Sequence, residues 1–217
     1  MKIFAWLMAL ALWGTTAQTV NFDSVKPGSV PPGWFTVEPD AHHPARWVVV
    51  KDPSAASPPH VFAQLDVDGV ASRGPLAILK KTEVKDGDLS VRVKPMAGKA
   101  DAAGGLVWRY RDPENYYLVR ANAVENTVAL YKVDGGKITP LTPVGARPDN
   151  YAVKHPVPPN QWSMLKVEFR GPLFSVYFNH KRLFEVRDST FTSPGKVGLW
   201  SGARAVTYFD DFRIATR

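Results

Sequence analysis

Two neighbouring segments of the chain carry side chains whose types suit the binding of a sugar. Arg109 lies in GLVWRYR, and Tyr116, Arg120 and Asn122 lie in NYYLVRAN. A sugar offers an apolar ring face and a rim of hydroxyl groups, so an aromatic ring beside planar hydrogen-bonding groups suits it. The same four side chains also fit an ordinary solvated strand surface, on which arginines pair with Asp and Glu. These residue types leave both interpretations open.

The other polar residues specify no reaction. The histidines show no metal-ligand spacing, and the adjacent His42 and His43 would point in opposite directions in an extended chain. The sequence contains neither a Gly-rich phosphate loop nor a nucleophile-elbow pentapeptide, although a dispersed Ser-His-Asp arrangement stays open. We therefore assign no catalytic residue.

One set of oxygen ligands could hold a structural Ca²⁺. Asn21 and Asp23 lie near the start of the chain, and Asp210 and Asp211 lie in its last apolar segment. If the terminal strands pair, these groups meet, and carboxylate and carbonyl oxygens are the ligands that Ca²⁺ prefers. The alternative, which we favour, is that the carboxylates cap backbone N–H groups or pair with Arg213. No other cofactor is expected.

The elements that must position these residues are short strands. Alternating apolar runs stand between clusters of Gly, Pro, Asn and Asp, which is typical of all-β proteins. The sequence predicts about a dozen strands, at 46–51, 61–66, 76–78, 88–95, 105–111, 115–123, 127–133, 164–170, 173–179, 181–186, 196–200 and 207–214. Tight turns are predicted at 134–136, 170–172 and 179–180, and proline-rich loops at 51–60 and 142–161. We predict a two-sheet antiparallel jelly-roll sandwich.

Strand alternation then assigns side chains to faces. In 105–111 it groups Leu106, Trp108 and Tyr110 on the buried face and places Arg109 on the other face. In 115–122 it groups Tyr117, Val119 and Ala121 inside, and Tyr116, Leu118, Arg120 and Asn122 outside. The prediction is that Arg109 and Arg120 point away from the core and share an outer face, beside the loop 142–161.

The N-terminal segment and the net charge restrict the class of protein. Residues 1–17 resemble a secretory signal peptide, with Lys2, an apolar run from Ile3 to Trp13, and Thr15-Thr16-Ala17 before a cleavage site at Gln18. That run is shorter than the roughly 20 residues that span a bilayer, and no second one follows. The expected product is a single domain over 18–217, periplasmic or secreted, without an integral membrane segment and monomeric. Its dispersed positive charge (+7 for the whole chain) suits solubility, and we expect no nucleic-acid binding.

The segments AGGLVWRYRDPENYYLVRANAVENTVALYKVDGGK (103–137) and QWSMLKVEFRGPLFSVYFNHKRLFEVRDSTFTSPGKVGLWSGARAVTYFDDFRI (161–214) also carry a family resemblance. They resemble exported bacterial proteins of the concanavalin A-like lectin/glucanase superfamily, of the 3-keto-disaccharide hydrolase (family-16-glycoside-hydrolase-like) type. FDSVKPGSVPPGWF and RWVVVKDPSAASPPHVFAQ extend the resemblance over nearly the whole mature chain.

The resemblance implies a concanavalin A-like fold and a carbohydrate partner, an oligo- or polysaccharide, bound by Arg109, Tyr116, Arg120 and Asn122. Glycosidases of that superfamily carry Glu-x-Asp-x-x-Glu on a strand, which supplies paired carboxylates. Here the nearest segment, 38–43, has His43 in place of the last Glu, and Pro39 interrupts the strand. We expect glycan binding without a catalytic dyad. The alternatives are a hydrolase acting on 3-keto-disaccharides and a non-catalytic envelope interaction domain.

Overall fold

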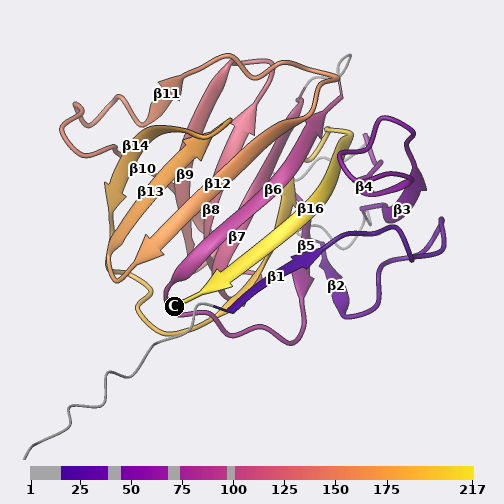
Figure 1. Cartoon of the computed structure of the whole chain (residues 1–217). Coiled ribbons are helices and arrows are strands. Elements are labelled where there is room, and N and C mark those ends of the chain that lie inside the picture. Colours follow the sequence, from indigo (N-terminus) through magenta and orange to yellow (C-terminus); the bar gives the residue numbers. More distant parts are fainter. Residues whose placement is uncertain (1–15, 39–44, 68–73, 97–100) are drawn as a thin grey trace, which may run out of the picture.

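The computed structural model describes residues 16–38, 45–67, 74–96 and 101–217. Over these ranges the chain forms sixteen strands and no helix, in two antiparallel sheets that pack face to face (Figure 1). No helix in the described ranges therefore has the length and apolar character to cross a membrane. The all-β, two-sheet prediction is confirmed.

We call the two sheets A and B. Sheet A has the order β14-β13-β12-β6-β16-β4-β3, and β1 also pairs with β16. Its strands are β1 (Thr16–Val20), β3 (Trp47–Lys51), β4 (His60–Gln64), β6 (Gly87–Pro95), β12 (Ser163–Arg170), β13 (Leu173–Phe178), β14 (Lys181–Arg187) and β16 (Thr207–Thr216).

Sheet B has the order β10-β9-β8-β7-β15-β5-β2, and β11 also pairs with β9. Its strands are β2 (Trp34–Val37), β5 (Leu76–Leu79), β7 (Ala103–Asp112), β8 (Asn115–Asn122), β9 (Thr127–Asp134), β10 (Lys137–Leu141), β11 (Ala152–Lys154) and β15 (Lys196–Ser201). All twelve predicted strands are present, whereas β1, β2, β10 and β11 were not predicted.

The main core lies between the sheets. It contains alternate residues of β6 and β12 from sheet A and of β8 from sheet B, all fully buried. Trp108 of β7 lies among them, with ring centroids 5.3 Å from Phe174 and 6.0 Å from Phe169. The prediction that Trp108 faces inward is confirmed. Because large buried aromatics contribute about 3–5 kcal/mol each, these cross-sheet contacts hold the two layers together.

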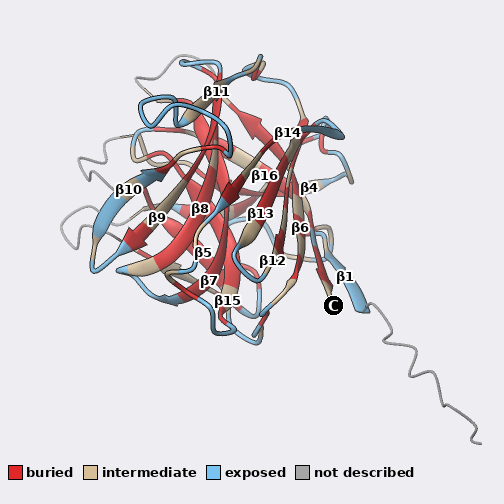
Figure 2. Cartoon of the chain, turned by 90° about the vertical axis from the view of Figure 1, so that its left-hand side faces the viewer, coloured by how far each residue is buried: buried red, intermediate tan, exposed pale blue. Residues whose placement is uncertain are grey.

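Sheet B is apolar on its outer face as well. A second cluster, which includes Val107, Tyr116, Leu118 and Trp200, lies on the side of the sheet opposite the main core. Figure 2 shows the largely buried colouring of β7 and β8, whereas β10 at the edge of the same sheet is mostly exposed. The solvated outer face that a simple sandwich implies is therefore absent from the centre of sheet B.

Three strands contain an extra residue that changes the alternation. One is β14, opposite Val176 and Tyr177 of β13, and the other two, β7 and β16, each redirect an arginine. In β7 the pairing with β15 steps from Val107 to Tyr110 while β15 steps from Gly198 to Lys196. In β16 the pairing with β6 steps from Asp210 to Arg213, against Arg92 to Ser90 on β6. Such β-bulges shift every following side chain to the other face.

Turn chemistry agrees with the predicted hairpins. Gly135 and Gly136 between β9 and β10 have φ of 55° and 78°. Asn179 and His180 between β13 and β14 have φ of 45° and 67°. Positive φ at both central residues matches the twist of the flanking strands, so each pair closes a tight hairpin.

Candidate functional site

Arg109 does not lie on the outer face, so the prediction for this residue is wrong. Its side chain is 1 % exposed and enters the space between the sheets. The guanidinium carbon lies 5.5 Å from the ring centre of Phe174 and 6.0 Å from that of Phe169, both members of the main core. Arg109 and Arg120 therefore do not share a face.

The bulge in β7 explains this reversal. Arg109 adopts φ of 48°, an uncommon left-handed conformation for a residue with a side chain. Relative to its partner β15, β7 has one additional residue between Val107 and Tyr110. Arg109 therefore stays on the same side of the sheet as Trp108, and Tyr110 turns to the outer cluster. Simple alternation predicted the opposite for both residues.

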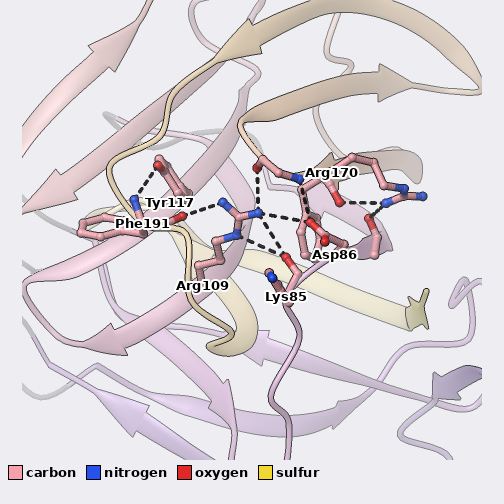
Figure 3. A network of polar contacts seen from close by, with 9 residues as sticks. Lys85, Asp86, Arg109, Tyr117, Arg170 and Phe191 are labelled. Carbon is pink, nitrogen blue, oxygen red and sulfur yellow. Dashed lines mark hydrogen bonds and ion pairs between the residues drawn. The ribbon is translucent and has the colours of Figure 1, made fainter.

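The guanidinium of Arg109 joins three segments of backbone (Figure 3). It donates hydrogen bonds to the carbonyl oxygens of Phe191 (2.6 Å), Gly171 (2.8 Å) and Lys85 (3.1 and 3.3 Å), and it lies 3.4 Å from Asp86. Burial lowers the pKa of this guanidinium. The contacts make Arg109 a structural residue that has no free donor directed to solvent.

Tyr116 and Asn122 lie on the predicted face but are covered. Tyr116 is 1 % exposed and packs in the outer apolar cluster. Asn122 is 2 % exposed, and its amide oxygen accepts hydrogen bonds from the backbone N–H groups of Val124 and Glu125. Asn122 thus caps the turn between β8 and β9, and neither side chain presents an open surface.

Arg120 is the accessible member of the predicted set. Its side chain is 19 % exposed and donates a 2.8 Å hydrogen bond to the Glu125 carboxylate. Its guanidinium lies 5.3 Å from the ring centre of Tyr131, and the Tyr151 ring packs edge-on against Tyr131 at 6.1 Å. The Nε atom of Arg120 is buried and has no hydrogen-bond partner among the described residues.

Asp101 adds a carboxylate to this group. It accepts a 3.2 Å hydrogen bond from the Asn122 amide. Burial raises the pKa of the Asp101 carboxyl, although the nearby positive charge of Arg120 opposes the shift. We call Asp101, Arg120, Glu125, Tyr131 and Tyr151 the Arg120 cluster. It combines aromatic rings with planar polar groups on the outer face of sheet B.

Sequence reasoning missed the partners of Arg120, although two signals were present. Tyr131 is the β9 partner of Leu118, and therefore lies diagonally across from Arg120 on the same face. Tyr151 comes from the predicted loop 142–161, which instead contains the short strand β11 beside β9. The expectation that this segment lies next to Arg120 agrees with the Tyr131–Tyr151 contact.

The segment that resembles a glycosidase motif gives no catalytic pair among the described residues. Glu38 follows β2, and its carboxylate accepts a hydrogen bond from the backbone of Ala45. Burial raises the pKa of Glu38. Residues 39–44, which include His42 and His43, lie outside the described residues.

The terminal carboxylates come together as the calcium hypothesis required. Asp210 is fully buried and accepts hydrogen bonds from the backbone N–H groups of Ser57 (2.6 Å) and Asp211 (2.8 Å). Asp23 accepts a 2.9 Å hydrogen bond from the Ser57 hydroxyl group. These are the capping contacts of the alternative, and no group of three acidic or histidine side chains in the described ranges is placed to hold a metal. Calcium binding stays a prediction.

Comparison with known proteins places the chain in a family. A family model described as the 3-keto-alpha-glucoside-1,2-lyase-like domain matches residues 22–215. The chain belongs to this family. The match covers both sheets from the loop before β2 to the end of β16, in agreement with the resemblance inferred from the sequence.

Two solved structures share the fold of this chain. The carbohydrate-binding module CBM66 from Bacillus subtilis is 20 % identical with a TM-score of 0.63, over 83 % of this chain and 94 % of the module. The cellulose induced protein Cip1 is 11 % identical with a TM-score of 0.66, over 92 % of this chain and 97 % of Cip1. These similarities confirm the jelly-roll sandwich.

A levanase from Bacillus subtilis (strain 168) is 28 % identical over 103 residues, which is 47 % of this chain. The match spans only 14 % of the levanase, so it concerns a small part of that protein.

Proposed function

We propose that this chain is an exported β-sandwich domain that binds a glycan through the Arg120 cluster. The observation that carries the proposal is the position of Arg120. It is directed outward beside the Tyr131 ring, which packs against Tyr151, and it has one carboxylate partner, Glu125. Donors, acceptors and an apolar ring surface are thus available on one face, which is the combination that a sugar requires. The similarity to a carbohydrate-binding module supports the same function.

The cluster is built more for recognition than for reaction. Arg120 already donates a hydrogen bond to the Glu125 carboxylate. A sugar hydroxyl group that replaces or joins this hydrogen bond would meet both a donor and an acceptor. The unsatisfied Nε of Arg120 offers a further donor after a small side-chain movement.

A glycan array, followed by affinity electrophoresis on the polysaccharides that bind, tests the proposal. Substitution of Arg120 by Ala should weaken binding at least about tenfold, because a charge-assisted hydrogen bond contributes roughly 1.5–3 kcal/mol. Lys137, exposed on β10 of the same sheet and remote in register from Arg120, provides the matched control, Lys137→Ala. Equal affinities of the two variants, or an array without any binding, would refute the assignment.

Export rests on the N-terminal sequence. Cleavage before Gln18 would remove Thr16 and Ala17, which pair with Thr216 and Ala215 at the end of β16, and would leave the rest of β1 in place. Expression of the whole chain in a Gram-negative host should give a periplasmic or secreted product that begins at Gln18. A cytoplasmic product that retains Met1 would contradict the proposal.

The family description favours a second candidate function, elimination across the C1–C2 bond of a 3-keto-glucoside. Such a step needs a base that takes the proton from C2, next to the ketone, while the C1–O bond breaks and the alcohol leaves. Asp101 lies in the Arg120 cluster with a pKa above its ordinary value, a property that suits proton transfer. Release of the alcohol from a 3-keto-α-glucoside, abolished in Asp101→Asn, would establish this activity. If no alcohol were released, the lyase activity would be refuted, and the glycan-binding proposal would stand.

A further inference from the structure

The outer face of sheet A carries a cation that no described residue neutralises. The bulge in β16 places Phe212 and Ile214 in the main core and thereby turns Arg213 outward, where it is exposed. Asp211, with φ of 46°, accommodates the extra residue. Without the bulge, alternation from Phe209 would have directed Arg213 into the core.

Strand pairing places Arg213 in a polar row across three strands. Ser90 of β6 pairs directly with Arg213 on one side and with Lys166 of β12 on the other. Directly opposite residues point to the same side, and neighbouring strands lie about 4.8 Å apart. Two cations therefore flank a small hydroxyl residue, at a spacing of roughly 10 Å that admits one small group between their side chains.

A cavity occupies this position. Its volume is about 210 Å³, and Ser90, Lys166 and Arg213 line it together with Met164, His180 and Asp88. Clefts for drug-sized ligands begin at roughly 300 Å³, so this pocket suits a single small group. Met164 supplies an apolar wall, while the side chains of Ser90, His180 and Arg213 have no hydrogen-bond partner among the described residues.

The charges around the pocket favour an anion. The Asp88 carboxylate, its acidic member, is already paired with Arg170 at 2.6 Å and with Arg217 at 3.3 Å. Lys166 donates to Glu168 at 2.6 Å, and both side chains are only about one-quarter exposed. Arg213 retains its whole guanidinium for a ligand. A planar guanidinium binds a carboxylate through two parallel hydrogen bonds, and Lys166 and Ser90 can add donors to the same group.

We propose that this pocket binds the carboxylate of a uronate residue in an acidic glycan. The identification of the ligand as a glycan rests on the proposed function, whereas the preference for an anion rests on the pocket alone. Met164 would contact the apolar face of the sugar ring, and the carboxylate would lie between Arg213 and Lys166. The Arg120 cluster lies on the opposite sheet, so the two surfaces bind separate parts of a glycan or separate chains.

Titration calorimetry at low salt with an oligogalacturonate, and with the same oligomer after methyl esterification, tests the proposal. The acidic oligomer should bind, and esterification should weaken it at least about tenfold because the charge is lost. Arg213→Gln should have an effect of similar size. Arg187→Gln provides the matched control, since Arg187 is exposed on β14 of the same sheet and outside the pocket. Ser90→Leu keeps every charge but fills the pocket floor, and it should also abolish binding.

Three results would overturn the inference. Equal binding of the esterified oligomer would show that the carboxylate charge is not recognised. Equal affinities of Arg213→Gln and Arg187→Gln would show that the ligand does not bind in this pocket. If inorganic phosphate displaced the oligogalacturonate as readily as free galacturonate does, the pocket would bind anions in general and not a uronate. Neutral glycans distinguish this inference from the proposed function, because their binding should depend on Arg120 and be unchanged in Arg213→Gln.

Discussion

Replacement of Arg109 by Met gives the sharpest test of how sheet B is built. Methionine keeps much of the aliphatic volume but removes the guanidinium, which leaves three backbone carbonyl oxygens without their donor. The two short bonds, to Phe191 and Gly171, contribute about 1–1.5 kcal/mol each as net terms, and the longer contact with Lys85 contributes roughly 0.5–1 kcal/mol. We discount the Asp86 pair, which is long and whose carboxylate is one-third exposed. The expected loss is about 2.5–4 kcal/mol.

Urea unfolding followed by tryptophan fluorescence measures this loss. If the dependence of the unfolding free energy on urea concentration has a similar slope for both proteins, the urea midpoint should fall in proportion to stability. The melting temperature should fall by roughly 5–16 °C. Arg120→Met is the control, because that arginine is partly exposed and its partner Glu125 is half exposed, so the expected cost is below about 1 kcal/mol. If the two variants lose the same small amount, Arg109 faces solvent and our account of the bulge is wrong.

Three further variants test neighbouring features of the fold. Asp101→Asn should gain stability relative to the wild type as pH rises above the ordinary carboxyl pKa of 3.8. The pKa of Asp101 is raised in the folded state, so its ionisation disfavours folding. Urea midpoints measured over a pH series test this, and parallel curves for the two proteins would contradict it. Gly195→Ala should lower the free energy of unfolding by about 1–3 kcal/mol, because the new Cβ would lie 2.6 Å from the backbone of Arg109 at the bulge. A variant that melts at the wild-type temperature would refute that packing. Tyr117→Phe removes a 2.6 Å hydrogen bond to Asp188 and should cost about 1–3 kcal/mol in calorimetric unfolding, and no loss would mean that the bond contributes nothing.

Calcium binding is a separate prediction about the chain termini. Titration with Ca²⁺ should release heat and raise the melting temperature if the carboxylates of Asp23 and Asp210 bind the ion. Asp23→Asn should then remove both effects. A titration without heat or thermal shift would leave these carboxylates with the backbone and hydroxyl contacts they already make.

The sequence predicted most of the fold because strand alternation is a local property. Where β8 runs without interruption, the inward positions of Tyr117, Val119 and Ala121 and the outward position of Arg120 followed directly. The four missed strands have weaker patterns. For example, β10 contains Pro140 at its exposed edge, and β11 has only three residues.

The site was predicted less well because burial and bulges depend on the rest of the molecule. Alternation assigned Tyr116 to the correct face, but it could not show that a second apolar cluster covers that face. Likewise, no local signal marked the extra residue in β7, because Arg109 itself, and not a glycine, adopts the positive φ. The three carbonyl acceptors around Arg109 come from loops distant in the sequence, and they stabilise the inward position.

The bulges in β7 and β16 each redirect an arginine, and together they determine which surfaces can bind a charged or polar ligand. The bulge in β7 withdraws Arg109 from sheet B and leaves Arg120 as the accessible arginine of that predicted set. The bulge in β16 does the reverse and exposes Arg213 on sheet A. Arg120 and Arg213 lie on opposite faces of the sandwich, separated by a core roughly 10 Å thick between such sheets. Their contributions to binding a long glycan should therefore add within about 0.5 kcal/mol, as expected for independent sites, whereas any larger coupling would mean that the two faces communicate through the core.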